Sequence, residues 1–182
     1  KPSSKAVAAN YTAGLCYMAK DNYDKATSYL NKAESIHTQL NLGDSAQLFN
    51  LQRGLIYKAK NNMELALPFF ETIIALPTNA TIANTKAEAL YQTGCIETQK
   101  NRSNLALNYL NKALDINEKS ENLEQRSDIL LALSNVHEKM LDKKTAYSYL
   151  KQHRNIKERI SIRNNKRLGI DDYTKFKQSQ RL

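Results

Sequence analysis

One short pattern recurs four times in this chain, at a constant interval of 40 residues. Each copy has an alanine, an aromatic residue three positions later, and Leu or Phe four positions later. These offsets place the three side chains on one face of a helix. A small side chain lets a neighbouring helix approach closely, so the constant interval predicts an array of stacked helices. The recurring alanines are Ala26, Ala66, Ala106 and Ala146.

A second small residue precedes each alanine by twelve positions: Gly14, Gly54, Gly94 and, in the fourth copy, Ser134. Asn- and Asp-rich turns lie between the two small residues, which predicts a helix, a tight turn and a second helix in every copy. The expected helices span 4–20, 23–40, 45–60, 63–76, 85–100, 104–119, 122–140 and 143–162.

Two local signals refine these bounds. Pro68 lies inside the fourth expected helix, where its missing N–H predicts a kink or a late start. Thr85 and Glu88 have the spacing of a capping box, which predicts that the fifth helix begins near Thr85.

The pattern resembles the tetratricopeptide repeat family. The resemblance rests on Gly14, Tyr17, Tyr23, Ala26, Leu30 and Ala33, and on counterparts such as Gly54, Tyr57, Ala66 and Phe70. The interval exceeds the family's usual length of about 34 residues. It is similar to the longer variant of kinesin light chains, bacterial peptide-sensing regulators, two-component kinases and helix-turn-helix regulators. The resemblance implies an all-α fold, a right-handed solenoid of four helical hairpins with a C-terminal capping helix.

The expected organisation is four repeats within residues 1–165, at about 5–42, 45–82, 85–121 and 122–162. Residues 163–167 break the helical pattern, and Gly169 allows the chain to reverse. We therefore expect residues 166–182 to form a separate capping helix or the start of a linker, and the sequence leaves these alternatives open.

Composition bounds the class of protein. Hydrophobic residues make up 41% and charged residues 25%, as in an ordinary globular chain, and no apolar run is long enough to span a bilayer. Cys16 and Cys95 are predicted to be buried and too far apart for a disulfide. The compartment, periplasmic or cytoplasmic, is left open.

Nothing in the sequence indicates catalysis. His37, His137 and His153 lack partners at metal-ligand spacing, and no phosphate-binding loop or nucleophile motif occurs. His137 takes the place of Tyr17 and Tyr57, and His153 that of Ala33, so both are predicted to be structural. We expect no enzyme activity, no cofactor and no metal.

The C-terminal end is basic. From Leu141 onward the chain has twelve Lys and Arg residues against four Asp and Glu residues. A solvated helix end is the favoured interpretation, and a nucleic-acid-associated regulator or an anionic membrane surface are the alternatives. No DNA-reading motif accompanies the charge, so nucleic acid is not favoured as the partner. The core of this basic patch is Arg159, Arg163, Lys166 and Arg167.

The resemblance implies that the first helix of each hairpin lines a concave groove, which would bind a protein or peptide. The groove is expected to be apolar at its amino end and polar at its carboxyl end, or else covered by a missing repeat. A homo-oligomer is left open. The terminal-carboxylate clamp of the chaperone-binding branch is absent, because its places hold Tyr11, Leu15, Gln52, Glu88 and Gln92. The predicted groove residues are Tyr11, Leu15, Met18, Leu51, Leu55, Lys58, Tyr91, Cys95, Thr98, Leu131, Asn135 and Glu138.

Overall fold

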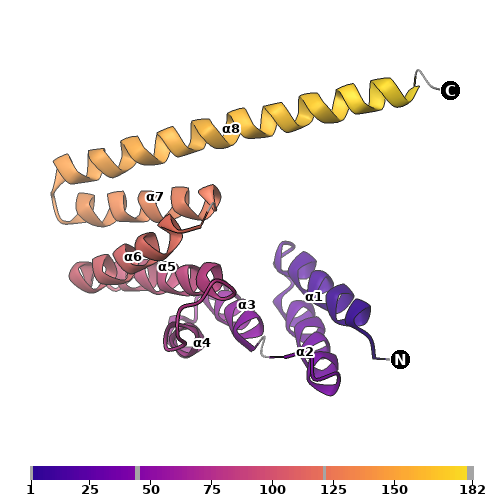
Figure 1. Ribbon diagram of the computed structural model, residues 1–182. Helices are drawn as coiled ribbons and strands as arrows, with labels where there is room; N and C mark the ends of the chain where they lie inside the picture. Colours follow the sequence, from indigo (N-terminus) through magenta and orange to yellow (C-terminus); the bar gives the residue numbers. More distant parts are fainter. Residues whose placement is uncertain (1, 44–45, 121, 180–182) are drawn as a thin grey trace. The chain divides into compact units, whose positions relative to one another are not determined.

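The computed structural model describes residues 2–43, 46–120 and 122–179, with side chains up to residue 169. These residues form eight α-helices and no strand (Figure 1). The all-α prediction is confirmed, and the expected helix ends agree to within two residues, except at the end of the last helix. The helices are α1 (Ser4–Met18), α2 (Tyr23–Gln39), α3 (Ala46–Ala59), α4 (Met63–Ile74), α5 (Ala83–Gln99), α6 (Ser103–Glu118), α7 (Leu123–Lys139) and α8 (Lys143–Ser179).

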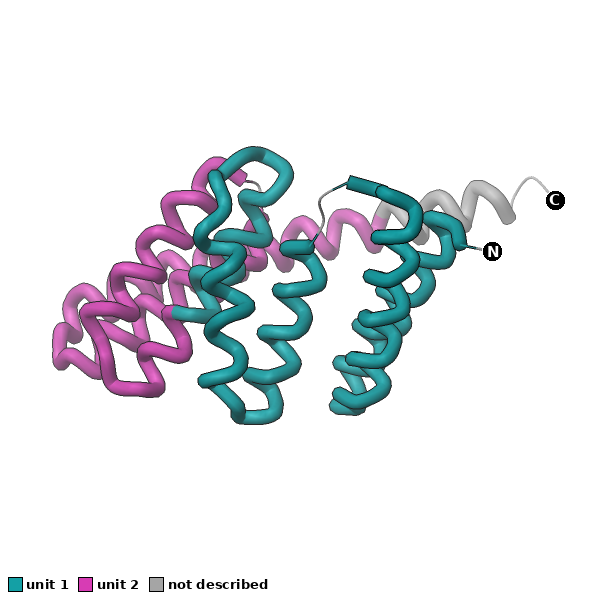
Figure 2. Tube along the Cα trace, turned by 90° about the horizontal axis from the view of Figure 1, so that it is seen from below, with its two compact units in different colours: residues 1–93 teal, residues 94–182 magenta. Residues whose placement is uncertain are grey.

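Contacts between Cα atoms divide the chain into two compact units, residues 1–93 and 94–182, coloured separately in Figure 2. The division falls inside α5. In unit 1, α1 packs on α2, α2 on α3, and α3 on α4. In unit 2, α6 packs on α7, and α7 on α8.

The turn inside each hairpin uses one residue in the left-handed region. Asp21, Asn61 and Asn101 have φ angles of 55°, 59° and 58°. Asn and Asp tolerate this region better than other non-glycine residues, because their short side chains bond locally. The next residue begins the second helix: Asn22 and Asn62 each accept a hydrogen bond from a backbone N–H three residues later. Turn chemistry thus determines where the second helix of these hairpins begins.

The recurring glycines allow the two helices of a hairpin to touch. A Cβ atom on Gly14 would lie 2.9 Å from Leu30 Cγ, and one on Gly54 would lie 2.4 Å from Phe70 Cε1. Gly94 and Leu110 repeat the arrangement at 2.7 Å. The bulky residue four positions after each alanine therefore fills the space that the glycine leaves.

The alanines themselves are enclosed. Ala26, Ala66 and Ala106 have no exposed surface, and Ala146 is 7% exposed. The four alanines therefore lie in alike buried surroundings, as the repeat pattern predicts.

In the fourth hairpin the glycine position, where the two helices touch, holds a residue with a hydroxyl group. Ser134 takes the glycine position, and its Oγ donates a hydrogen bond of 2.8 Å to the backbone oxygen of Ala146. The carbonyl groups of Ala26 and Ala106 face Gly14 and Gly94 in the same way, 3.4 and 3.3 Å from the Cβ position. A serine fits here because its one polar atom meets a carbonyl oxygen.

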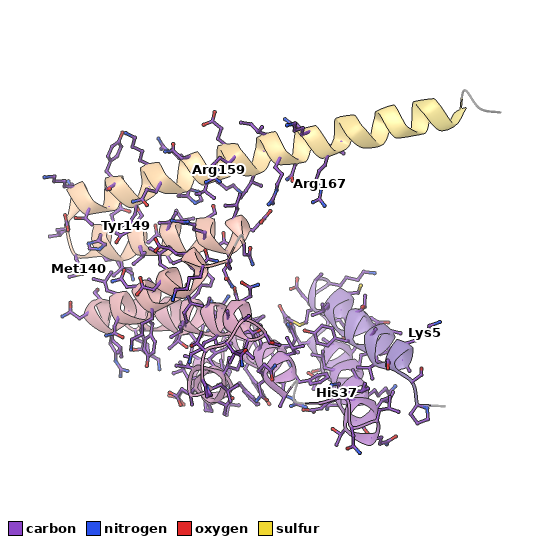
Figure 3. The ribbon with its side chains drawn as sticks, viewed as in Figure 1. Lys5, His37, Met140, Tyr149, Arg159 and Arg167 are labelled. Carbon is purple, nitrogen blue, oxygen red and sulfur yellow. The ribbon has the colours of Figure 1, made fainter. Side chains whose placement is uncertain are left out.

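Stacked aromatic rings join the two helices near each turn. Tyr17 lies on Tyr29 with ring centroids 5.3 Å apart, and Tyr57 lies on Phe69 at 5.6 Å. In the fourth hairpin His137 lies on Tyr149 at 5.6 Å, between α7 and α8 (Figure 3). Such pairs contribute about 0.5–1.5 kcal/mol beyond their buried area.

The third hairpin departs from this ring pattern. It has Glu97 in place of a ring, and this buried carboxylate lies 3.3 Å from Arg102.

The structure corrects the expected end of the array. Instead of breaking at 163–167 and reversing at Gly169, α8 continues without interruption from Lys143 to Ser179. Ile156 and Ile160 pack against Leu130 of α7. Because the two helices run in opposite directions, α8 then continues past the N-terminal end of α7 (Figure 1). The separate capping helix is therefore wrong, and the domain boundary at residue 165 remains only a prediction.

Three smaller predictions also differ from the structure. The fourth helix begins at Met63 despite Pro68, so there is no late start. The fifth begins at Ala83, because Asn79 accepts a hydrogen bond from the Ile82 N–H, while Thr85 is buried inside the helix. Both cysteines are free, but Cys16 is exposed and Cys95 half-buried, so burial of Cys16 was predicted wrongly.

Candidate functional site

In unit 1 the predicted groove positions separate into an exposed row and a covered row. Leu15 is 37% exposed, and Met18 and Leu55 are partly exposed. Leu51 is only 8% exposed and belongs to the packing between helices. The positions one and four residues after each glycine therefore reach the surface of unit 1, whereas the position three residues before it is largely covered.

Polar side chains cross between the first helices of unit 1. Gln52 on α3 donates a hydrogen bond of 3.1 Å to the hydroxyl of Tyr11 on α1. Burial raises the pKa of Tyr11, and the hydrogen bond from Gln52 lowers it in part. Lys58 donates to Gln92, and Gln92 donates a bond of 2.7 Å to Glu88. Tyr91 lies half-buried on α5 beside this row. These bonds hold residues that lie on the same helices as the exposed Leu15 and the partly exposed Leu55.

In unit 2 the structure brings together four of the predicted groove residues. Cys95 and Thr98 lie on one face of α5, three residues apart, and Asn135 and Glu138 have the same spacing on α7. Together they line a hollow of about 480 Å³, which Gln99, Ala132 and Lys139 complete. Leu131, 36% exposed, is not part of its lining. Lys139 Nζ donates a hydrogen bond of 2.9 Å to the carbonyl oxygen of Thr98 and so holds the end of α7 against that of α5.

The hollow presents polar atoms that face solvent. Asn135 and Glu138 are exposed, and within the described part of the chain the side chain of neither makes a hydrogen bond or an ion pair. An Asn side chain offers one acceptor and two donor hydrogens, and an ionised Glu accepts at both oxygens. The arrangement can bind a peptide main chain and a cationic side chain.

The three histidines are used in packing. His37 makes an edge contact with Phe49, with centroids 5.8 Å apart. His153 Nδ1 lies 2.9 Å from the carbonyl oxygen of buried Ser127. His137 Nδ1 lies 3.3 Å from Asp142 Oδ2, and hydrogen bonds from Thr145 together with His137 lower the pKa of Asp142.

The described residues hold no cluster of three or more His, Cys, Asp or Glu side chains that could bind a metal ion.

The basic patch lies in the middle of α8, between Arg159 and Arg167. Arg159 and Arg167 are exposed, and Figure 3 shows their places on this helix. Lys166 is also exposed, whereas Arg163 forms an ion pair with Glu124 on α7. Three of the four predicted cations therefore face solvent. No helix in the described ranges combines the length and hydropathy needed to cross a bilayer.

Sequence reasoning assigned no binding role to Gln52, Gln92 and Lys139. Their one visible signal is position: Gln52 and Gln92 recur at the interval of 40 residues. The position predicts a shared location but not a partner: Gln52 bonds to Tyr11 on α1, whereas Gln92 bonds to Lys58 on α3 and to Glu88 on its own helix.

Three solved structures share this fold. BtubC (BKLC) from P. vanneervenii has a TM-score of 0.64 at 16% identity, over 85% of this chain and 64% of its own. Aspartyl phosphate phosphatase F from Bacillus subtilis has a TM-score of 0.63 at 13% identity, over 86% of this chain and 41% of its own. A putative kinesin light chain from Podosopora anserina with nearly identical TPR-like repeats has a TM-score of 0.59 at 15% identity, over 88% and 79%. The chain thus spans less than two thirds of the length of the first two.

Sequence comparison identifies the repeat itself. No curated protein sequence gives a match. The family model for the tetratricopeptide repeat matches residues 7–39, 49–79 and 87–120, which together make up more than half of the chain. The fourth hairpin lies outside these matches, and it is the one with Ser134 at the glycine position and His137 at the tyrosine position. With its helical hairpins, its recurring small residues and this match, the chain belongs to the tetratricopeptide repeat family.

Proposed function

We propose that this chain is a non-catalytic scaffold that binds a protein or peptide against the first helices of its repeats. The observation that carries the proposal is the hollow of unit 2, where Asn135 and Glu138 face solvent without partners among the described residues. Tetratricopeptide repeats form a protein-interaction fold, and this general role supports the proposal.

The lining suggests what the ligand looks like. A side-chain amide can donate to a peptide carbonyl and accept from a peptide N–H, so Asn135 suits an extended main chain. Glu138 adds a carboxylate, which favours a nearby Lys or Arg side chain on the ligand. In unit 1 the exposed Leu15 and the partly exposed Leu55 favour an apolar contact instead.

A narrower role follows from the long repeat. We propose the sensor or assembly region of a bacterial signalling regulator. The long repeat interval carries this proposal, because the similarity to aspartyl phosphate phosphatase F from Bacillus subtilis, at 13% identity, shows a shared fold alone.

Binding by the hollow is tested with a display library of short peptides selected on the wild-type chain. A selected peptide is then titrated by fluorescence anisotropy into wild type, Asn135→Ala and Glu138→Ala. Each substitution removes a solvent-facing polar group from the hollow, so we expect affinity to fall about tenfold for each.

Asn108→Ala is the matched control, because Asn108 is an exposed Asn on the second helix of its hairpin. Its affinity should equal that of wild type. Equal affinities for all four proteins would exclude the hollow as the binding site.

A further inference from the structure

Four residues of α8 correspond, position by position, to a surface of α2 that bonds to the next helix of unit 1. Adding 120 to the residue numbers of α2 gives the equivalent positions of α8, because three repeats of 40 residues separate them. Asp24, Thr27, Asn31 and Glu34 of α2 thus correspond to Lys144, Tyr147, Lys151 and Arg154. We call these four residues of α8 the outer α8 face.

In unit 1 the next helix, α3, lies beside this α2 surface and bonds to it through polar side chains. Asp24, Thr27 and Asn31 line one hollow together with Arg53, Ile56 and Lys60 of α3. Arg53 donates hydrogen bonds to Glu34 at 3.2 Å and to Asn31 at 3.0 Å. Lys60 Nζ lies 2.9 Å from Asp24 Oδ1. Acidic and amide groups on the second helix of one hairpin therefore hold cations on the first helix of the next.

On α8 the same positions carry three cations and an exposed ring where α2 has two carboxylates, an amide and a hydroxyl. Tyr147 is 64% exposed, whereas its equivalents Thr27, Leu67 and Leu107 are partly buried. Lys144, Lys151 and Arg154 are exposed and have no ion-pair partner among the described residues. From Lys143 to Lys157 the helix has no Asp or Glu, and Glu158 follows one turn after Arg154.

We propose that the outer α8 face is a docking site for an acidic helix of a partner protein. The α2–α3 contact defines what the partner must carry. Arg53 and Lys60 are seven residues apart, with Ile56 between them, so the complementary helix has carboxylates seven residues apart and an apolar residue three positions after the first. The apolar residue then covers the ring of Tyr147. The first carboxylate pairs with Arg154 and Lys151, and the second pairs with Lys144.

A second copy of this chain stacked through α1, as α3 lies on α2, does not supply that pattern. The α1 residues equivalent to Arg53 and Lys60 are Ala13 and Lys20. A copy stacked through α1 would place Lys20 against Lys144, which is a repulsive pair. Within the described residues, α8 also stays helical for twenty-five residues after Arg154, so this helix does not itself turn back onto the outer α8 face. That length is about 38 Å, at roughly 1.5 Å per residue.

The first experiment is a selection of peptide ligands on the wild-type chain. A display library of helix-forming peptides of about 20 residues, long enough to hold a helix, is selected on the wild-type chain. Counter-selection uses the double variant Lys151→Glu/Arg154→Glu. We expect acidic sequences with two carboxylates seven residues apart and an apolar residue between them. Enrichment of neutral or basic sequences, or no enrichment at all, would overturn the proposal.

Affinity measurements then distinguish binding at the outer α8 face from non-specific attraction by the positive charge of α8. A selected peptide should bind Lys151→Glu/Arg154→Glu at least about tenfold more weakly, since two exposed pairs become repulsive. The control Lys157→Glu/Arg159→Glu makes the same change of net charge on other sides of the same helix. It should change affinity by less than about twofold. Equal losses in both double variants would mean that long-range charge, and no defined face, attracts the peptide.

Tyr147→Ala tests the apolar contact without altering charge, and its side chain is exposed enough that folding should be unaffected. We expect about a fivefold loss, and an unchanged affinity would contradict the helix-packing geometry.

Three further arms use duplex DNA, vesicles containing phosphatidylserine, and the chain alone at rising concentration. Tight DNA or vesicle binding, or self-association, that Lys151→Glu/Arg154→Glu abolishes and Lys157→Glu/Arg159→Glu preserves would assign the face to that ligand and overturn the proposal. Because the hollow of unit 2 is not involved, Asn135→Ala should bind the selected helix as wild type does.

Discussion

The close approach at Gly54 gives the sharpest test of the packing described above. A Cβ atom there would lie 2.4 Å from Cε1, 2.8 Å from Cζ and 2.9 Å from Cδ1 of Phe70. Ordinary carbon contacts are about 3.5–4.0 Å, so the ring would have to retreat by about 1 Å. Phe70 has no exposed surface, and its neighbours are packed at the density of a solid. Gly54→Ala is therefore an overpacking substitution in the middle of a hairpin.

The expected cost combines two opposing effects. Overpacking a well-filled core costs about 1–3 kcal/mol, and three ring atoms under 3.0 Å place this site at the upper end. Replacing Gly by Ala inside a helix returns about 1 kcal/mol through helix propensity. We therefore expect Gly54→Ala to lower the free energy of unfolding by about 1–2 kcal/mol, measured by urea denaturation followed by circular dichroism.

Two companion variants determine whether the clash is the cause. Gly169→Ala is the matched control, because Gly169 is inside α8 and a Cβ atom there would meet nothing within 4 Å. It should lose no stability. In a Phe70→Leu background, where the ring edge is gone, Gly54→Ala should cost about 1 kcal/mol less than in wild type. The packing argument is refuted if Gly54→Ala and Gly169→Ala behave alike, or if the cost does not depend on Phe70.

The remaining predictions concern the fourth turn. Leu141 has a φ of 63° and is 81% exposed, where the other turns have Asp or Asn. Leu141→Asn should therefore raise the free energy of unfolding by about 0.5–1 kcal/mol, whereas Met140→Asn, at a φ of −82°, should not. Hydrogen bonds from Thr145 lower the pKa of Asp142, so its carboxylate stabilises the fold above the unfolded pKa of 3.8, and this contribution is lost as the pH falls through the lower folded pKa. The stability difference between wild type and Asp142→Asn should therefore shrink in urea titrations between about pH 6 and about pH 3, and a constant difference would contradict this assignment.

The helical hairpins could be predicted because a hairpin needs small residues where its helices touch and a turn-forming residue between them, and both are visible in the sequence. Small residues at Gly54 and Ala66 mark where helices touch, and Asn61 marks the turn between them. Each of these residues acts through its own backbone or its own lack of bulk, so its type identifies its role. The constant interval then transfers the assignment to the other hairpins, including the fourth, where Ser134 replaces glycine.

The errors have two causes: a local signal that was too weak to end a helix, and burial that depends on neighbouring elements. Gly169 predicted a break, but a single glycine costs a helix only about 1 kcal/mol, and α8 continues through it. Cys16 was predicted to be buried, yet α1 leaves that side chain exposed. The helical period identifies which residues share a face, but not whether another element covers that face.

The candidate site was predictable in part for the same reason. The positions of Thr98, Asn135 and Glu138 followed from the period, and the structure brings them to one hollow. Leu51 was placed on the same surface but is covered by packing. The outer α8 face could not be inferred from the sequence alone, because its meaning depends on the observed pairing of Arg53 and Lys60 with α2.

The central claim is that the first helices of the hairpins carry the binding surface. The most direct measurement is an NMR titration of the isotopically labelled chain with a peptide selected on the wild type in the presence of excess acidic helix, which occupies the outer α8 face. The account predicts that the largest chemical-shift changes fall on Cys95, Thr98, Asn135 and Glu138, the lining of the hollow. Changes centred on α6, or on the exposed side of any second helix, with these four residues unmoved, would contradict it.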